Sequence, residues 1–318
     1  MAVDLATTPS TLPAASPLAG RRQQPRARFP WVPFFLILPA LIVLAAVLFY
    51  PIALAIYSSF FDIGMMNLSN QTFIGLDNYV TMVHTPAFWA SARVTLIYTA
   101  GVVIGAYAVG LGAAMLLNKP FRGRAIARTM IIIPWAIPNV VTVMIWNWML
   151  DANYGVVNYI LSVFHLIDTN LQWRAMPHLA QISVIGVTVW TTFPVALVML
   201  LAGLQAIPRD LYEAASVDGA NAWQRFRHIT WPGLAPVNIV LILMLTLLAF
   251  TRVVTIIYLM TAGGPAGATE TLPIQTYLQA FKFFRMGYAS AIGTIVLIIA
   301  VIFSLIYLRM TSRLYKQD

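Results

Sequence analysis

The chain has 318 residues, of which 60% are hydrophobic and only 9% are charged. So small a polar fraction cannot cover the surface of a soluble globular protein of this length, and the composition excludes that class. The mean hydropathy of +0.80 comes from several long apolar stretches, so most of the protein is expected to lie in a lipid bilayer. The absence of cysteine excludes disulfides, thiolate metal sites and thiol catalysis.

The first 30 residues are rich in Ala, Pro, Thr and Ser and carry four arginines before Trp31. This composition is typical of a disordered, solvated tail. A basic segment followed by apolar residues also resembles a signal peptide, but the apolar run over about 32–60 is longer than the apolar part of such a peptide. We therefore predict a basic cytoplasmic tail over 1–30 and a membrane domain over 31–318.

The membrane domain is predicted to be all-α, with six membrane-spanning helices. Each expected span is near the roughly 20 residues that cross the hydrocarbon core of a bilayer. An even number of spans places both termini on the same side of the membrane. The expected spans are approximately 32–60, 94–117, 126–150, 179–203, 236–261 and 288–309.

Prolines lie within or at the edges of several expected spans. Each removes a backbone hydrogen bond and can kink its helix, and a bundle of bent helices can enclose a pathway. Proline is also common in membrane helices generally, which is the simpler explanation for any single one. These residues are Pro39, Pro51, Pro134, Pro138 and Pro194.

The distribution of Lys and Arg predicts the orientation of the bundle, because these residues accumulate in cytoplasmic loops. Fourteen lie on one side and three on the other, so we expect both termini and the loop over about 204–235 to be cytoplasmic. The net charge of +9 then reflects topology, and no nucleic-acid partner is expected. The first group is Arg21, Arg22, Arg26, Arg28, Lys119, Arg122, Arg124, Arg128, Arg209, Arg225, Arg227, Arg309, Arg313 and Lys316; the second is Arg174, Lys282 and Arg285.

The loop over about 204–235 is predicted to form two short helices joined by a glycine turn. Pro208 suits the first turn of a helix, and Gly219 suits its left-handed C-terminal cap. Asn221 is expected to cap a second helix that ends at Pro232.

The surface of this loop is unusually apolar for an exposed connection. Ala214 and Ala215 would let another backbone come close, and Trp223, Phe226 and Ile229 repeat at spacings of three along the second helix. Such a patch is expected to need a partner.

The same loop resembles the EAA motif of ABC importer permeases, Glu-Ala-Ala-x3-Gly-x9-Ile-x-Leu-Pro. Glu213-Ala-Ala is followed after three residues by Gly219, and after nine more by Ile229, with Pro232 three residues later. The one departure is Trp231, where the family usually has leucine; another large apolar residue is expected to pack there.

The resemblance implies that this loop contains the coupling helix, which docks into a cleft on a nucleotide-binding subunit. It further implies that Glu213 pairs with a basic group of that subunit, that Gly219 permits the turn, and that Ile229 and Pro232 fix the second arm. The alternative for Glu213 is a solvated surface acid. The expected coupling surface consists of Glu213, Ala214, Ala215, Asp218, Gly219, Trp223, Phe226, Ile229 and Pro232.

The partners implied are a second related permease subunit, two nucleotide-binding ATPase subunits and an extracytoplasmic solute-binding protein. The chain has no Gly-x4-Gly-Lys-Ser/Thr loop, so we expect it to bind no cofactor and ATP and Mg²⁺ to bind to the ATPase subunits. The expected location is the cytoplasmic membrane of a prokaryote, where the chain is a non-catalytic, multi-pass subunit.

Other segments are similar to permeases of the carbohydrate-uptake type, over about residues 32–310. The Thr-x-Gly-Gly-Pro segment resembles the MalF half of the maltose permease rather than its MalG half. The segments that carry this likeness are Tyr50-Pro-Ile52, Phe73-Ile-Gly-Leu-Asp-Asn-Tyr79, Gly110-Leu-Gly-Ala-Ala-Met-Leu-Leu-Asn118, Thr261-Ala-Gly-Gly-Pro265 and Gly287-Tyr-Ala-Ser-Ala-Ile292.

Candidates for the substrate pathway are polar and aromatic residues within spans, because sugars bind through hydrogen bonds and stacking. Thr188, Thr191 and Thr192 share one helix face, although threonines in membrane helices commonly bond their own backbone. Trp146 and Asn147 could hold a sugar, or the tryptophan could belong to an interfacial belt.

Arg252 is the one charge well inside a span and is a functional candidate, together with Phe250 and Tyr258. Snorkelling to the interface or pairing with a neighbouring subunit is the rival interpretation. Many relatives carry Phe-Asp shortly after this basic position, whereas Val254-Thr255 stand here. That departure weakens the transfer of any particular substrate.

Two other classes of function find less support in the sequence. An intramembrane enzyme would need paired carboxylates, a nucleophile with its base, or metal-ligand spacing within the spans, and an ion channel or ion-coupled carrier would need carboxylates there. All ten acids lie in tails, loops or span edges. The leading cargo is a disaccharide or oligosaccharide; glycerol 3-phosphate or a polyol is the alternative, since Arg252 could bind an anionic group.

Overall fold

The computed structural model describes residues 31–64 and 71–314, apart from the side chains of 32–34, 251–253 and 310–314. The predicted tail over 1–30 lies outside the described residues.

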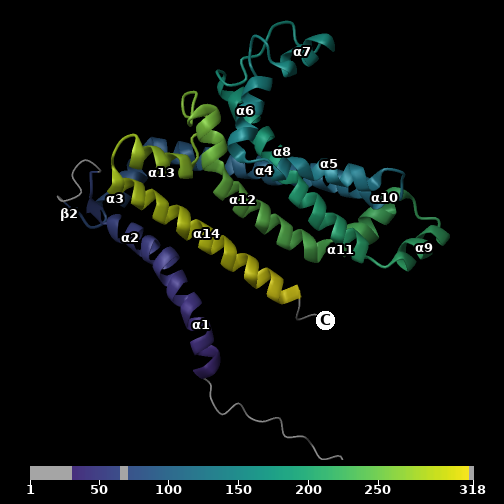
Figure 1. Cartoon of the computed structure of the whole chain (residues 1–318), viewed down its shortest axis with the longest axis horizontal. Helices are drawn as coiled ribbons and strands as arrows, with labels where there is room; N and C mark the ends of the chain where they lie inside the picture. The colour runs from purple at the N-terminus through teal and green to yellow at the C-terminus, as the bar shows by residue number, and fades with distance from the viewer. Residues whose placement is uncertain (1–30, 65–70, 315–318) are drawn as a thin grey trace, which may run out of the picture. The chain divides into compact units, whose positions relative to one another are not determined.

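In the described part the chain is helical with one short hairpin (Figure 1). The first elements are α1 Trp31–Leu44, the π-helix η1 Ala45–Phe49, α2 Tyr50–Ser58, strands β1 Phe61–Asp62 and β2 Thr72–Phe73, α3 Asp77–His84, α4 Pro86–Asn118, α5 Arg124–Ala136, α6 Asn139–Met149 and α7 Val156–Val163. There follow α8 Pro177–Ala206, α9 Arg209–Val217, α10 Ala222–Arg225, the π-helix η2 Phe226–Thr230, α11 Trp231–Gly233, α12 Ala235–Thr261, α13 Leu272–Phe281 and α14 Met286–Leu314.

The chain divides into two compact units, residues 1–51 and 52–318. In the first unit, α1 and η1 carry large apolar side chains that are exposed, among them Leu36 and Val47. A helix that is apolar on all sides, with a hydrophobic stretch from Phe35 to Ser58, is suited to contact with lipid.

The second unit is built around α4, α8 and α12, which pack against one another. Two clusters of buried side chains fill the space between them. One contains Tyr98 of α4, Val184 of α8 and Ile256 of α12, and the other contains Ala114, Leu200 and Leu241 from the same three helices. These three helices therefore form the core of the second unit and position the loops that connect them.

Small residues bring α4 and α8 into close contact. A Cβ atom added at Gly110 would lie 2.6 Å from the Cβ of Ala196 and 3.0 Å from the backbone nitrogen of Leu197. Membrane helices associate through such close backbone approach, because lipid supplies no hydrophobic force between them. Glycine at position 110 is thus required by the packing of the two longest helices of the bundle.

Four helical segments in the described part of the chain are long and apolar enough to cross a membrane: 35–58, 86–118, 177–206 and 286–309. The number rises to six if each of two bent helix pairs counts as one span. The multi-pass, all-α membrane architecture expected from the sequence is thus confirmed, while the exact six spans and the orientation of the termini remain predictions.

Over the expected span at about 126–150 the structure has two helices, α5 and α6, bent by 98° relative to each other (Figure 1). Ile137, between them, has an extended backbone with ψ of 131°. The ring of Pro138 disfavours the helical conformation of the residue before it, so the helix ends there and restarts at Asn139.

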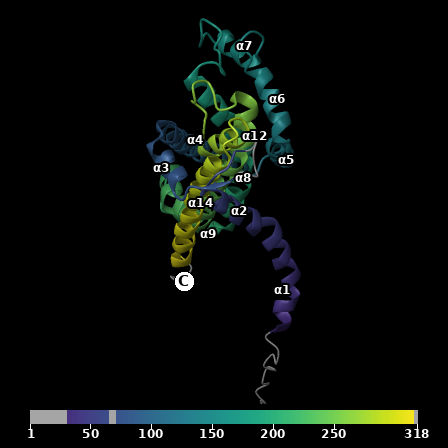
Figure 2. The same cartoon turned by 90° about the vertical axis from the view of Figure 1, so that its left-hand side faces the viewer.

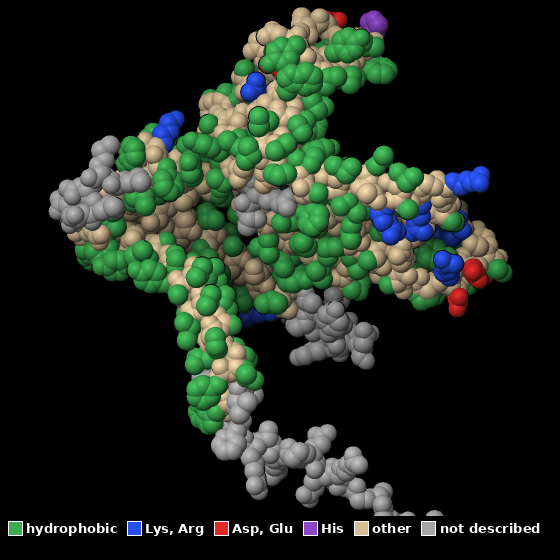
Figure 3. Space-filling model, viewed as in Figure 1, with side chains coloured by type: hydrophobic (Ala, Val, Ile, Leu, Met, Phe, Trp, Pro, Cys, Tyr) green, Lys and Arg blue, Asp and Glu red, His purple; other side chains and the backbone are tan. Residues whose placement is uncertain are grey.

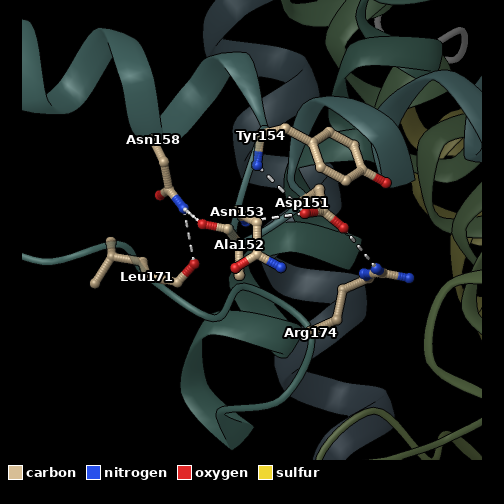
Figure 4. Close-up of polar contacts among 7 residues, drawn as sticks. All are labelled: Asp151, Ala152, Asn153, Tyr154, Asn158, Leu171 and Arg174. Atoms are coloured by element: carbon tan, nitrogen blue, oxygen red, sulfur yellow. Dashed lines mark hydrogen bonds and ion pairs between the residues drawn. The ribbon is translucent and has the colours of Figure 1, made fainter.

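Beyond α6 lies a folded segment, residues 150–176, that carries α7 away from α14 in both views (Figures 1 and 2). The buried side chain of Asn158 ties it together: its amide donates to the carbonyls of Ala152 and Leu171, and its oxygen accepts from the indole of Trp173. Asp151 and Arg174 add an ion pair of 3.9 Å (Figure 4). These contacts give a loop between two predicted spans a fixed shape.

Candidate coupling loop and membrane path

The first arm of the loop is α9, and it ends at a glycine turn. Gly219 has a φ of +77°, in the left-handed region that glycine adopts without a steric penalty. The N–H of Ala220 donates to the carbonyl of Ala215 at 2.8 Å, and that of Gly219 to Ser216 at 3.2 Å. This pair of bonds is the Schellman arrangement, so the predicted glycine cap is confirmed.

The second arm begins with the expected asparagine cap. The side-chain oxygen of Asn221 accepts from the N–H of Gln224 at 2.9 Å, and the side-chain oxygen of Gln224 accepts from the N–H of Asn221 at 2.8 Å. This reciprocal pair is a capping box and confirms the predicted start of the helix.

The helical chain ends at Gly233, one residue beyond the predicted end at Pro232. The preceding turn, η2, is a wider π-helix in which the N–H of Trp231 donates to the carbonyl of Phe226. In an ordinary α-helix a proline ring clashes with the carbonyl four residues earlier; the wider turn leaves room for it. The change of direction comes later, as a 69° bend between α11 and α12.

Two side-chain hydrogen bonds hold the arms together. The hydroxyls of Tyr212 and Thr230 lie 2.9 Å apart, and the Nη1 of Arg225 donates to the hydroxyl of Ser216 at 2.9 Å. The arms enclose an open hollow of about 340 Å³, lined in part by Asp218. The sequence analysis missed both pairs, because partners 18 and 9 residues apart share no helical spacing.

A row of aromatic rings connects the loop to the bundle. The ring centroids of Trp223 and Phe226 lie 5.7 Å apart, those of Phe226 and Trp231 6.2 Å, and those of Trp231 and Tyr107 of α4 6.3 Å. Trp231, which departs from the family motif, thus packs as a large apolar residue. Ile229 turns inward and packs against the buried cluster of α4, α8 and α12, so Trp223, Phe226 and Ile229 do not form one exposed face.

The outer surface of α9 is exposed and unpartnered within the described part of the chain. Glu213 and Ala214 are exposed, and the carboxylate of Glu213 makes no hydrogen bond or ion pair there. Val217 is 88% exposed and Trp223, at the start of the second arm, 66%. At the end of the chain where α9 and α10 lie, charged and hydrophobic side chains stand side by side (Figure 3), so the surface suits contact with another protein better than contact with lipid.

The three threonines proposed for the membrane path are buried in α8. The hydroxyl of Thr188 donates to the carbonyl of Val184 and lies 2.7 Å from the hydroxyl of Tyr98, and that of Thr191 donates to the carbonyl of Thr188. These two side chains therefore have partners within the chain. Thr192 has a buried hydroxyl without one in the described residues.

Trp146 and Asn147 lie on α6 and are half-buried. The ring of Trp146 meets that of Trp190 of α8 edge-on at 5.7 Å, so an aromatic pair lies at the contact of α6 and α8. The indole nitrogen of Trp146 and the amide oxygen of Asn147 are both buried without a hydrogen-bond partner among the described residues. Unpaired buried polar atoms are costly and are found where a ligand or another chain supplies the missing partner.

The remaining candidates lie on α12. Phe250 is half-buried, and Tyr258 is exposed and meets Tyr277 of α13 with ring centroids 4.8 Å apart. The side chain of Arg252 is outside the described part of the chain.

Polar residues at the start of α13 and along it were missed by the sequence analysis. Thr271, Gln275 and Gln279 are spaced by four residues, and each has a buried side-chain oxygen without a partner in the described residues. The spacing of four was visible in the sequence, but α13 is too short to have been recognised as an element from its apolar residues.

Glu270 lies in the connection between α12 and α13, and its surroundings affect it more than any other carboxylate of the described residues. Burial raises the pKa of Glu270, and the hydroxyl of Ser91 at 3.5 Å and the charge of Lys282 oppose this effect only in part. The side chain therefore sits where its charged form is poorly solvated.

Comparison with known proteins identifies the family of the chain. Residues 106–316 match the model of the family described as binding-protein-dependent transport system inner membrane component. The chain is 36% identical to the trehalose/maltose transport system permease protein MalF of Thermococcus litoralis, over 87% of this chain and 92% of that protein. It is 36% identical to the sulfoquinovosyl glycerol transport system permease protein SmoG of Agrobacterium fabrum, over 86% and 88%.

A solved structure shares the fold. It is a bacterial alginate ABC transporter in complex with an alginate pentasaccharide-bound periplasmic protein, matched with a TM-score of 0.74 and 22% identity over 89% of this chain and 95% of that chain. The resemblance to ABC importer permeases is thus confirmed. The chain belongs to the family of binding-protein-dependent transport system inner membrane components and is a permease subunit of an ABC importer, a membrane component rather than a catalyst.

Proposed function

We propose that the chain is one permease subunit of an ATP-driven importer of a disaccharide or oligosaccharide. It forms half of the translocation pathway with a second, related permease and receives the work of ATP hydrolysis through the loop between α8 and α12. The pathway alternates between outward- and inward-facing states, biased by ATP binding on the partner subunits.

The observation that carries the proposal is the exposed carboxylate of Glu213 on an apolar, two-armed loop. Its charge has no partner within the described chain, and Ala214 beside it leaves room for another backbone. The capped arms and the aromatic row to Tyr107 hold this surface against the bundle. A displacement of α9 by a partner would therefore move α4 and α12 as well, because the loop between them is not flexible.

The carbohydrate cargo is supported by two observations. The relatives are described as transporting trehalose and maltose or sulfoquinovosyl glycerol, and the protein with the shared fold is described as an alginate ABC transporter. In this chain Thr192, Trp146 and Asn147 carry buried polar atoms without a partner among the described residues, and the ring of Trp146 packs against that of Trp190. Hydrogen-bonding groups beside aromatic rings suit the hydroxyls and apolar faces of a sugar.

The proposal includes the partners and the location of the complex. Two ATPase subunits bind ATP and Mg²⁺, a solute-binding protein delivers the cargo from outside, and the assembly lies in the inner membrane of a prokaryote with both termini of this chain in the cytoplasm. A channel or ion-coupled carrier would instead transport without ATP.

The experiment is a comparison of Glu213→Gln with Asp210→Asn in the assembled transporter reconstituted in liposomes. Both changes remove one exposed carboxylate from α9, but only Glu213 belongs to the proposed contact. Because loss of a charge-assisted contact costs roughly 1.5–3 kcal/mol, we expect Glu213→Gln to lower binding-protein-stimulated ATPase activity and uptake by about tenfold or more. Asp210→Asn should leave both close to the unmodified level.

Equal activity of Glu213→Gln and the unmodified transporter would contradict the coupling role. Uptake that proceeds without ATP would contradict the importer mechanism itself. The cargo is tested separately, by thermal-shift measurements of the cognate solute-binding protein with disaccharides, polyols and glycerol 3-phosphate; stabilisation by glycerol 3-phosphate alone would exclude the sugar.

A further inference from the structure

A second cavity lies at the ends of two candidate spans, where α4 and α8 end and α5 and α9 begin. Its volume is about 640 Å³, within the usual range for small-molecule sites. Three cationic side chains from different segments line it, and no carboxylate of the described chain does. The lining residues used below are Lys119, Arg124, Leu204, Ile207, Arg209 and Tyr212.

The three cations have no anionic partner in the described chain. The side chains of Lys119, Arg124 and Arg209 make no hydrogen bond or ion pair there, and the Nε of Arg124 is buried without an acceptor. Like charges around one hollow repel one another, so this arrangement favours an anion between them.

The positions of the two arginines strengthen this conclusion. Arg124 is the first residue of α5 and Arg209 the first of α9. The N-terminus of a helix carries partial positive charge, so a cation there is unfavourable by itself, and neither helix has a side-chain cap at this end. Lys119 differs, because it follows the C-terminus of α4, where a cation is favoured locally.

The cavity lies where two candidate membrane spans end. The candidate spans 86–118 and 177–206 both end beside it. Its lining combines the cations with the apolar side chains of Leu204 and Ile207 and with Tyr212. A phospholipid fits such a lining, because its anionic headgroup can contact the cations while the start of its acyl chains contacts the apolar side chains. Basic pockets between membrane helices bind such headgroups.

We propose that this cavity binds a phosphate group, with Arg124 and Arg209 as its principal ligands and Lys119 as the third cation. The phosphate belongs to an anionic lipid headgroup or to a free phosphate, and the position at the ends of two spans favours the lipid. Binding would link α5 to α9, and so fix the start of the coupling loop against the bundle.

The test uses the purified full-length chain in detergent and native mass spectrometry with three probes: dioleoylphosphatidylglycerol, dioleoylphosphatidylcholine and inorganic phosphate. The double variant Arg124→Gln/Arg209→Gln removes the two principal ligands. The matched control, Arg122→Gln/Arg227→Gln, removes two exposed arginines from the same loops that do not line the cavity. Both variants lose the same net charge.

We expect the unmodified chain to bind phosphatidylglycerol in preference to phosphatidylcholine, and the double variant to bind it at least about tenfold more weakly, because charge-assisted hydrogen bonds are lost. The control should bind as the unmodified chain does. Saturable binding of inorganic phosphate alone, lost in the same variant, would assign the site to a free phosphate. Arg124→Lys/Arg209→Lys keeps both charges and should retain more binding than the glutamine variant.

The proposal is overturned if the double variant and the control lose binding equally, since the effect would then be one of net charge. It is also overturned if the double variant, with an unchanged unfolding temperature, binds as well as the unmodified chain. Loss of lipid binding when the ATPase subunits are added to the unmodified chain would likewise overturn it, because the cavity would then be part of that protein contact.

Discussion

At the scale of single residues, Glu270 illustrates how burial of a carboxylate raises the free energy of its ionised form. Its carboxylate lies between α12 and α13, with only the hydroxyl of Ser91 and the more distant Lys282 to stabilise the ionised form. Burial raises its pKa above the value in the unfolded chain, so the folded protein binds this proton more tightly than the unfolded one. The stability that Glu270 contributes is therefore fully present at a pH below its pKa in the unfolded chain. It is lost as the pH rises through its pKa in the folded protein.

Replacing this side chain with Gln removes its ionisation. We expect Glu270→Gln to unfold at a higher temperature than the unmodified chain at neutral pH, and this difference to shrink as the pH falls toward about 4, where both side chains are neutral. Thermal unfolding in detergent between about pH 4 and pH 8 checks it. Asp168→Asn, which removes an exposed carboxylate, is the control; a pH-independent difference for Glu270→Gln would contradict the burial argument.

At the scale of elements, the contact between α4 and α8 depends on which glycine faces the partner helix. Gly110 and Gly112 lie two residues apart on α4, yet a Cβ at Gly110 would collide with Ala196 whereas a Cβ at Gly112 would meet nothing within 4 Å. The intrinsic effect of replacing glycine in a helix is the same at both positions. The two sites therefore separate helix propensity from packing.

Alanine substitutions at these sites should have opposite effects. Gly110→Ala forces the helices apart and is expected to cost about 1–3 kcal/mol, whereas Gly112→Ala should stabilise the fold by about 0.5–1 kcal/mol because it only lowers the entropy of the unfolded chain. The unfolding midpoints of the two purified variants measure this. A rise in the midpoint for both would show that α4 and α8 do not approach as closely as described.

At the scale of the whole molecule, the loop between α8 and α12 joins two environments. Its inner side, with Ile229, belongs to the buried cluster of the bundle, and its outer side exposes Glu213, Val217 and Trp223. The capping box and two side-chain hydrogen bonds hold the shape of this surface. A partner can then bind this surface without the loss of conformational entropy that ordering a flexible loop would cost.

Hydrogen–deuterium exchange of the free chain and of the complex with its ATPase subunits tests this arrangement. We expect backbone amides over 209–233 to exchange at least about tenfold more slowly in the complex, which corresponds to roughly 1.4 kcal/mol of local stabilisation. The folded segment over 150–176, at the other end of the bundle, should exchange at an unchanged rate and serves as an internal control. Equal protection of both regions would indicate general stabilisation and not docking.

Much of this protein was predictable from local patterns in the sequence. Apolar stretches of sufficient length predicted helices at all six positions, and the Gly219 cap and the Asn221 capping box follow from residues within a few positions of one another. The spacing of the motif from Glu213 to Pro232 indicated the family. These features depend on residues that are close in the sequence, so they can be predicted from the sequence alone.

The differences arose where a local pattern allows more than one outcome. Pro134 and Pro138 predicted a possible kink, but not that the helix ends at Ala136 and restarts at Asn139, because a proline in a membrane helix can either kink or break it. The continuation of the helix through Pro232 depends on a π-helical turn whose wider spacing has no distinct residue pattern.

The sequence by itself determined that this is a multi-pass membrane permease, because length, apolarity and the spacing of the motif from Glu213 to Pro232 are properties of the chain. Only the tertiary structure decided that Ile229 faces the bundle, that Thr188 is bonded to Tyr98, and that Arg124 and Arg209 meet at one cavity. Each of these joins residues far apart in the sequence, and the close packing of α4, α8 and α12 brings them together.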